Sequence, residues 1–256
     1  MAVQRNIQSI ERAAAILRAL SGRNRRLGVS EIADEVDLPK GTVHGLLRTL
    51  QQVGFVEQDA DSSKYQLGPA LLHMGSSYLD GNELRTRALN WSDSLAARTN
   101  EAVRIGTLHE HQVLIVHHVF RPDNSLQTLD VGSLLPMHAT ALGKVLLAHH
   151  PFVATELSKA ELPAYTAATI TDPERLEREL DRVREQGWAA DLGELVADQV
   201  SLAAPIHDRR GSIAGAMGIF GPPERLTSVH RPNSELLAAV REAARAVSRE
   251  LGAIPW

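Results

Sequence analysis

Cysteine is absent from the 256-residue sequence, and aromatic residues make up only 4% of it. Without cysteine the chain can form neither disulfide bonds nor thiolate metal sites, which agrees with a reducing cytoplasm. No apolar run approaches the roughly 20 residues that span a bilayer. Polar residues from Gln4 to Asn6 come too early for the apolar core of a secretory signal. These absences predict a soluble, cytoplasmic protein without a membrane partner.

Charge is unevenly distributed along the chain. The whole sequence carries a formal net charge of −4 at pH 7, which argues against a nucleic-acid partner at face value. Residues 1–50, however, contain eight Lys or Arg against five Asp or Glu. Because a docking face acts through its local field, this N-terminal part stays compatible with DNA. A length of 256 residues is sufficient for two domains.

Three short helices are predicted in the first 53 residues. Apolar residues recur at helical spacing over residues 9–21, and Ser30 then begins a second short helix. Pro39 ends that helix, because proline disfavours helical geometry in the residue before it. The third helix runs from Lys40 to about Val53. Its apolar face consists of Val43, Leu46, Leu47, Leu50 and Val53.

The opposite face of the third helix is small and polar, with a cation at each end. It carries Gly41, Thr42, His44, Gly45, Arg48, Thr49 and Gln52. A helix that enters the major groove of DNA needs such short side chains and hydrogen-bond donors. Two short strands, 55–57 and 64–67, follow around a turn-rich segment. The pattern favours a winged helix-turn-helix, with a small helical bundle of no particular function as the alternative.

Four segments in this part resemble the IclR family of bacterial transcription regulators. They are Ile7 to Ala13, Ser30 to Ala33, Leu38 to His44 and Tyr65 to Gly68. Many members of that family carry Ser where this chain has Gly41, and Arg where it has Gly45. An Arg at the groove contacts a phosphate or a guanine, and this chain lacks that contact at Gly45. The operator sequence of a relative therefore cannot be assumed for this chain.

The predicted partner of residues 1–68 is a double-stranded DNA operator. The residues expected at the DNA are Arg5, Ser30, Lys40, Gly41, Thr42, His44, Gly45, Arg48 and Lys64. Residues 69–82 read as a linker helix with apolar residues at helical spacing. This helix favours a homodimer or homotetramer, because paired recognition helices read two half-sites about one DNA turn apart.

Residues 83–256 mix helical and strand patterns. Helices are predicted over 83–99, from about Thr140, from Asp172 to Arg184 and over 233–251. Strands are predicted over 102–108, 113–119, 200–206 and 213–220. Helices beside a largely antiparallel sheet give an α+β domain. The family resemblance implies a GAF-like sensor domain that binds a small effector.

Three segments are candidate walls of an effector pocket. The start of the helix near Thr140 could hold an anion or a carbonyl on its free N–H groups, although an ordinary capped helix explains it equally well. A loop places Asp191 and Glu194 beside Trp188, and the last hairpin supplies the third wall. The family resemblance implies effector contacts at Thr140, Ala141, Leu142, Asp191, Ser201, Gly218 and Phe220, and the same segments add Met137 and Glu194 as expected effector-binding residues.

A narrower match within the family lies in segments 115–123 and 203–210. It implies a regulator of glycerol uptake and catabolism, a repressor released by glycerol or glycerol 3-phosphate. The alternative is an activator or repressor of another carbon-catabolic pathway that responds to a small organic acid. An enzyme is disfavoured, because the sequence has no Gly-rich phosphate loop and no nucleophile elbow. No cofactor and no metal site are predicted, since neighbouring histidines on a strand point to opposite faces.

Overall fold

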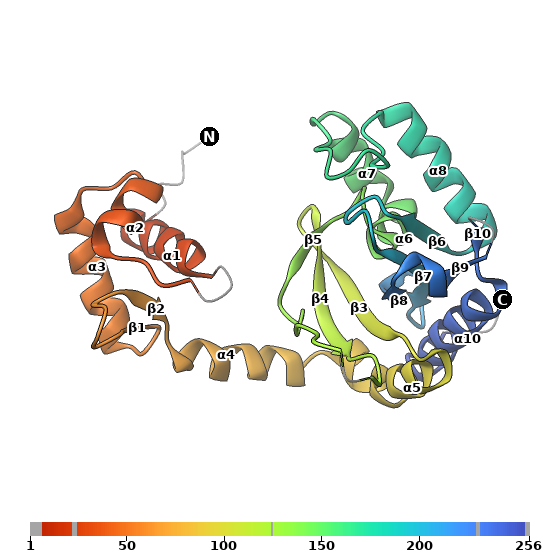
Figure 1. Cartoon of the computed structure of the whole chain (residues 1–256), viewed down its shortest axis with the longest axis horizontal. Helices are drawn as coiled ribbons and strands as arrows, with labels where there is room; N and C mark the ends of the chain where they lie inside the picture. The colour runs from red at the N-terminus through yellow and green to blue at the C-terminus, as the bar shows by residue number, and fades with distance from the viewer. Residues whose placement is uncertain (1–6, 22–24, 124, 229–230, 254–256) are drawn as a thin grey trace. The chain divides into compact units, whose positions relative to one another are not determined.

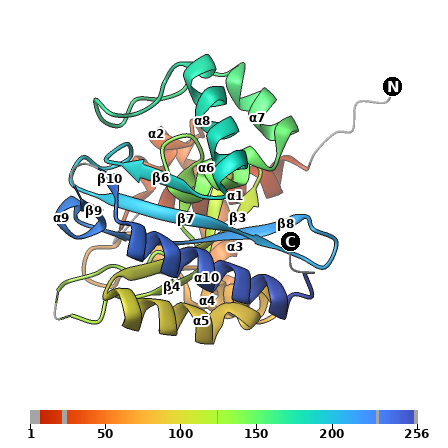
Figure 2. The same ribbon diagram turned by 90° about the vertical axis from the view of Figure 1, so that its right-hand side faces the viewer.

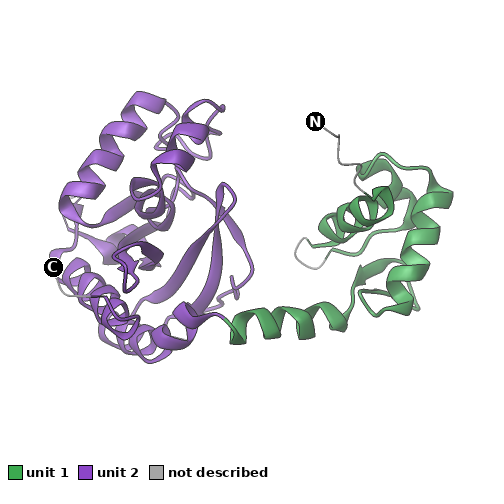
Figure 3. Cartoon of the chain, turned by 180° about the vertical axis from the view of Figure 1, so that it is seen from behind, with its two compact units in different colours: residues 1–81 green, residues 82–256 purple. Residues whose placement is uncertain are grey.

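The computed structural model describes residues 7–21, 25–123, 125–228 and 231–253. The chain divides into two compact units, residues 1–81 and 82–256 (Figure 3). Each unit has a hydrophobic core of its own, and the predicted linker helix falls within the first unit. None of the helices in the described ranges is long and apolar enough to cross a membrane.

The first unit consists, in its described part, of three helices, a two-stranded hairpin and a fourth helix (Figure 1). Their bounds are α1 Gln8–Leu20, α2 Val29–Glu35, α3 Lys40–Gln52, β1 Val56–Gln58, β2 Tyr65–Leu67 and α4 Pro69–Asp80. Ile16, Ile32 and Leu47, one from each of the first three helices, are fully buried in one cluster. Burial of each such side chain contributes about 2 kcal/mol. The order of elements confirms the predicted winged helix-turn-helix.

The second helix does not begin at Ser30, as the sequence predicted. Its N-cap residue is Gly28, and Ser30 is an exposed residue inside the first turn. The carboxylate of Glu31 accepts the backbone N–H of Gly28 at 2.6 Å. An acid in the first turn therefore satisfies the helix start, a task that was expected of the serine hydroxyl.

The third helix ends one residue earlier than predicted. Val53 lies beyond it and is 52% exposed, so its place on the buried face was wrong. Gly54 follows with φ 74°, a left-handed conformation that glycine adopts without steric cost. This turn directs the chain away from the axis of α3, and the strand β1 follows.

Helix α4 is unusual because none of its residues is buried. Pro69 occupies its first turn, where the missing N–H costs nothing. Three large apolar side chains of this helix, Leu72, Met74 and Tyr78, are each more than half exposed. These exposed apolar side chains make α4 a candidate for a surface that a partner covers.

The second unit has the predicted α+β architecture. Its elements are α5 Glu83–Thr99, β3 Ala102–His109, β4 Gln112–Val119, β5 Leu134–Pro136, α6 Ala141–Ala148, α7 Pro151–Ser158, α8 Pro173–Gln186, β6 Ala189–Leu192, β7 Val200–His207, β8 Ile213–Gly221, α9 Pro223–Leu226, β9 Thr227–Ser228, β10 Arg231–Pro232 and α10 Ser234–Glu250. Asp172 caps α8 by accepting the N–H of Arg175 at 2.7 Å. Gly187 ends that helix with φ 72°, as predicted.

The main sheet runs in the order β5-β4-β3-β8-β7-β6, and each pair of neighbours is antiparallel. Helices α5 and α10 lie side by side on one face, and α6, α7 and α8 lie on the other (Figure 2). Strand β6 pairs only with residues 200–203 of β7. The second half of β7 is therefore an edge of the sheet.

Close backbone packing fixes the buried helix α6 against the chain that precedes it. A Cβ atom at Gly143 would lie 2.2 Å from the carbonyl oxygen of Met137, so only glycine fits there. On the sheet, a Cβ atom at Gly218 would lie 2.5 Å from the carbonyl oxygen of Leu202. The first approach holds α6 to the chain before it, and the second holds β8 against β7. A hollow lies between the start of α6 and these strands.

Candidate functional site

The third helix, α3, presents two chemically different faces. Val43, Leu47 and Leu50 are buried in the core of the first unit. The other face carries the predicted set, of which Lys40, Gly41, His44, Gly45 and Arg48 are exposed and Thr42 is partly exposed. The structure therefore brings six of the residues predicted at the DNA together on one helix.

Two glycines leave a bare strip on this exposed face. A Cβ atom at Gly41 or Gly45 would meet nothing within 4 Å, and neither glycine has a positive φ. Glycine inside a helix costs about 0.5–1 kcal/mol relative to alanine. Nothing in the described part of the first unit requires glycine at these positions. The strip admits a close approach of another molecule, as a groove-binding helix requires.

Charge on the exposed face of α3 is available to a partner. Lys40 and Arg48 have no ion-pair partner among the residues that the structure describes. On the hairpin side, Lys64 lies 3.2 Å from a carboxylate oxygen of Glu31 and is partly neutralised. Ser30 is exposed on α2, and Arg5 lies outside the described residues.

The second unit contains a hollow against strands β3, β7 and β8, which we name the sheet hollow. It measures about 340 Å³, part of it open to solvent. Six of the predicted effector residues line it: Thr140, Leu142, Asp191, Ser201, Gly218 and Phe220.

Thr140 sets one wall of the sheet hollow. Its hydroxyl accepts the N–H of Gly143 at 3.1 Å and donates to the carbonyl of Pro136 at 2.7 Å. The residue thereby caps α6 and ties it to β5. This confirms the predicted helix start, and it shows that the hydroxyl is already used for the fold.

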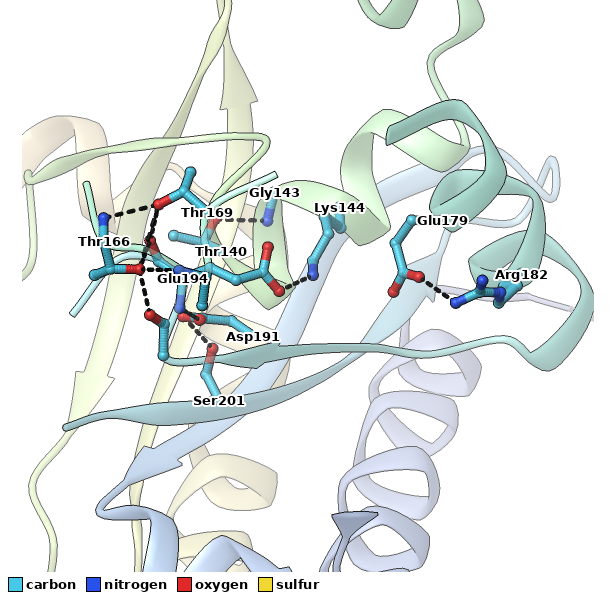
Figure 4. Close-up of polar contacts among 12 residues, drawn as sticks. Thr140, Gly143, Lys144, Thr166, Thr169, Glu179, Arg182, Asp191, Glu194 and Ser201 are labelled. Atoms are coloured by element: carbon cyan, nitrogen blue, oxygen red, sulfur yellow. Dashed lines mark hydrogen bonds and ion pairs between the residues drawn. The ribbon is translucent and has the colours of Figure 1, made fainter. Parts of the chain in front are cut away.

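Asp191 places a buried carboxyl group in the sheet hollow. It is 3% exposed, accepts the N–H of Glu194 at 2.6 Å and lies 3.3 Å from the hydroxyl of Ser201 (Figure 4). Burial raises the pKa of Asp191 to about 6, against the lowering effect of the Glu194 N–H. A carboxylate kept in such surroundings binds hydroxyl donors strongly.

Glu194 does not line the sheet hollow, because its carboxylate turns to a lysine. Lys144 Nζ lies 2.5 Å from Glu194 Oε1, and the two side chains are 1% and 9% exposed. Thr166 and Thr169 donate their hydroxyls to backbone carbonyls of the same loop, at Gly193 and Glu194 (Figure 4). The pair joins α6 to the loop after β6, so it fixes two walls of the hollow together.

Arg104 of β3 also lines the sheet hollow and was missed by the sequence reasoning. Its Nε lies 2.9 Å from Asp130 Oδ2, and its guanidinium carbon lies 3.4 Å from the centre of the Phe220 ring. Burial lowers the pKa of the neighbouring His118 to about 4, so Arg104 is the cation that balances Asp130. The signal in the sequence was Arg104 itself, a single cationic residue within a largely apolar predicted strand.

Two other predicted residues lie elsewhere. Met137 and Ala141 are 1% and 0% exposed and belong to the hydrophobic core beneath α6. Gln199, which does line it, carried no recognisable signal in the sequence. Within the described ranges, no group of three His, Asp or Glu side chains is placed to hold a metal ion.

Family comparisons agree with this arrangement. Residues 9–60 match the IclR helix-turn-helix domain, and residues 76–249 match the bacterial transcriptional regulator IclR C-terminal domain. The chain belongs to the IclR family of transcriptional regulators. A glycerol operon regulatory protein of Streptomyces coelicolor is 55% identical over 249 residues, which cover 97% of this chain and 98% of that protein.

Solved structures of family members share the fold of the whole chain. A putative transcriptional regulator from Rhodococcus sp. RHA1 matches with a TM-score of 0.81 and 29% identity, covering 96% of this chain and 98% of that one. An IclR homolog from Microbacterium hydrocarbonoxydans, complexed with 4-hydroxybenzoate, matches with a TM-score of 0.81 and 27% identity over 95% and 98% of the two chains.

The Lys144–Glu194 pair leads to a first prediction. Lys144→Met leaves a buried carboxylate without its cation, so the free energy of unfolding should fall by about 3 kcal/mol. All three tryptophans of the chain lie in residues 82–256, so their fluorescence during urea unfolding follows this unit. Lys159→Met is the control, since Lys159 pairs with Glu156 on the surface and should change the value by under about 1 kcal/mol. Equal losses for both variants would contradict the role of the buried pair.

The raised pKa of Asp191 leads to a second prediction. Between about pH 4 and pH 6 the folded state binds more protons here than the unfolded state, so this group makes stability fall as pH rises. Asp191→Asn keeps an oxygen for the Glu194 N–H and removes that loss. At pH 7.5 the variant should be more stable than the wild type by about 2 kcal/mol, with the difference vanishing near pH 4. Urea unfolding across this range measures it, and Asp198→Asn, at an exposed aspartate of the same loop, should leave the pH profile unchanged.

Proposed function

We propose that the chain is a repressor of an operon for glycerol uptake and catabolism, released when a small metabolite occupies the sheet hollow. The observation that carries this proposal is the 55% identity, over nearly the whole length, to a glycerol operon regulatory protein. The exposed face of α3 and the polar lining of the hollow support it from the structure. Its target is DNA, so we place its action in the cytoplasm, and we assign it no enzymatic activity.

DNA binding by α3 follows from the chemistry of its exposed face. Lys40 and Arg48 supply positive charge to the DNA backbone or to guanine, and Thr42 and His44 supply hydrogen-bond donors. The strip at Gly41 and Gly45 lets the helix lie deep in the groove. Charge on α3 offsets the overall net charge of −4 at the point of contact.

The charge balance of the sheet hollow favours a neutral hydroxylated effector. Arg104 is paired with Asp130, so Asp191 is the charged group left for a ligand. A polyol hydroxyl donates to that carboxylate, whereas a phosphate group would be repelled by it. We therefore propose glycerol as the occupant of this hollow in preference to glycerol 3-phosphate.

A small organic acid is the second candidate effector. Arg104 supports this class, because its guanidinium lines the hollow and can pair with a carboxylate of the ligand as well as with Asp130. The relative from Microbacterium hydrocarbonoxydans was solved with 4-hydroxybenzoate, which makes this class a reasonable comparison. In that case the regulator would control another carbon-catabolic operon, as an activator or a repressor.

Fluorescence anisotropy with DNA from upstream of the protein's own gene tests the proposed function. Arg48→Gln should weaken binding about tenfold and reduce the slope of log affinity against log salt by about one. Arg18→Gln is the matched control, because Arg18 is an exposed arginine of α1 in the same unit, and it should bind like the wild type. Equal binding by Arg48→Gln would contradict the assignment of α3.

The same assay then separates the effector candidates. Glycerol should release the DNA from the wild type, and Asp191→Asn should need at least tenfold more glycerol while it still binds DNA. Release by glycerol should also weaken below about pH 6, where Asp191 gains its proton. Release by a benzoate but not by glycerol would replace the first candidate with the second.

We also propose that α4 forms a subunit contact, which gives a homodimer or a homotetramer. Its exposed apolar side chains support this, since paired DNA-binding units need a stable partner. Leu72→Ser combined with Tyr78→Ser should raise the dissociation constant of self-association at least tenfold in sedimentation velocity. Leu126→Ser, at an exposed leucine of the second unit, is the control and should leave association unchanged. An unaltered sedimentation profile of the double variant would overturn this contact.

A further inference from the structure

A second hollow on the second unit shares no lining residue with the sheet hollow. We name it the basic hollow. It measures about 560 Å³, part of it open to solvent, and its lining includes His149, Arg184, His207, Arg241 and Arg245. Three arginines and two histidines thus face one space, and no aspartate or glutamate of the described ranges lines it.

The edge of the main sheet explains why this space is not filled by another strand. Beyond Ala203, strand β7 has no partner on the side of β6 within the described residues. Pro205 has no N–H to offer, and the N–H of His207 donates to the hydroxyl of Ser248 at 3.0 Å. These two positions therefore leave no backbone N–H that needs a further strand. The ends of α6 and α8 and one face of α10 enclose the space beside this edge.

Two of the arginines are not used by the fold. Arg184 donates to the carbonyl of Ala148 at 2.8 Å and pairs with Glu177 and Asp181, so it holds α8 to α6. Arg241 and Arg245, one turn apart on α10, have no hydrogen-bond or ion-pair partner among the described residues. Their guanidinium groups are available, and two guanidiniums beside each other match the oxygens of a phosphate group.

The histidines report the same positive surroundings. The pKa of His149 is lowered first by burial and then by the nearby His207, His150 and Arg184. Its Nε2 atom is buried and has no hydrogen-bond partner in the described part of the chain. The rings of His149 and His207 lie edge to face, with 5.5 Å between their centres. An anion in this space would relieve the repulsion and accept a hydrogen bond.

We propose that the basic hollow is a second small-molecule site that binds a phosphate group, as inorganic phosphate or as a phosphate monoester. The chemistry is opposite to that of the sheet hollow, where Asp191 repels phosphate. Both sites lie on β7: Ser201 and Ala203 line the sheet hollow, whereas Ala204 and His207 line the basic hollow. A phosphorylated product of the operon's enzymes could therefore be sensed beside the unphosphorylated inducer.

Isothermal titration calorimetry of the full chain with inorganic phosphate, at constant ionic strength and without DNA, tests this site. The wild type should bind, and Arg245→Gln should lower the affinity at least tenfold. Arg249→Gln is the matched control, because Arg249 is an exposed arginine one turn further along the same helix and does not line the hollow. Arg241→Gln, in the wall of the hollow, should lose at least as much as Arg245→Gln.

A parallel titration with glycerol 3-phosphate distinguishes the two sources of phosphate. Tighter binding than inorganic phosphate would assign the site to a phosphate monoester, and equal binding would mean that the phosphate group alone is recognised. The proposal is overturned if neither ligand binds the wild type, or if Arg249→Gln loses as much affinity as Arg245→Gln. Thermal unfolding without phosphate shows that each variant is folded. Because DNA is absent, failure here leaves the proposed response to glycerol standing.

Discussion

The buried ion pair between Lys144 and Glu194 holds the effector side of this regulator together. Neither charge can leave its partner without a large desolvation cost, so α6 and the loop after β6 keep a fixed separation. Asp191 accepts the backbone N–H of Glu194, so the pair also fixes the loop to which Asp191 is bonded, and burial raises the pKa of Asp191. The recognition chemistry of the hollow thus depends on a contact that does not itself line it.

Long elements of the fold were predictable from the sequence, because local signals mark their ends. Helix α5 has the predicted bounds, and α8 begins at the Asp172 cap and ends at Gly187. The short strands β5 and β6 and the helix α7 were not predicted. A strand of three or four residues has no periodicity to recognise, and its existence depends on pairing with distant residues.

The site was predictable to a different degree in each unit. Helical periodicity alone separates the buried and exposed faces of α3. In the sheet hollow, the family resemblance supplied Thr140, Asp191 and Ser201, which do line it, but it could not decide which way Met137 points. Burial of Met137 is a tertiary feature with no counterpart in the local pattern, since its backbone packs closely against Gly143 of α6. Arg104 and Gln199, which the family resemblance did not include, could be recognised as lining residues only from the folded structure.

The bare glycine strip on α3 has a consequence for the history of such regulators. Because open space surrounds Gly41 and Gly45, larger side chains can occupy these positions without disturbing the core beneath. A single codon change could then redirect the protein to a new promoter while its folding and its metabolite response persist. Duplicated copies of the gene would be free to diverge in target before they diverge in anything else.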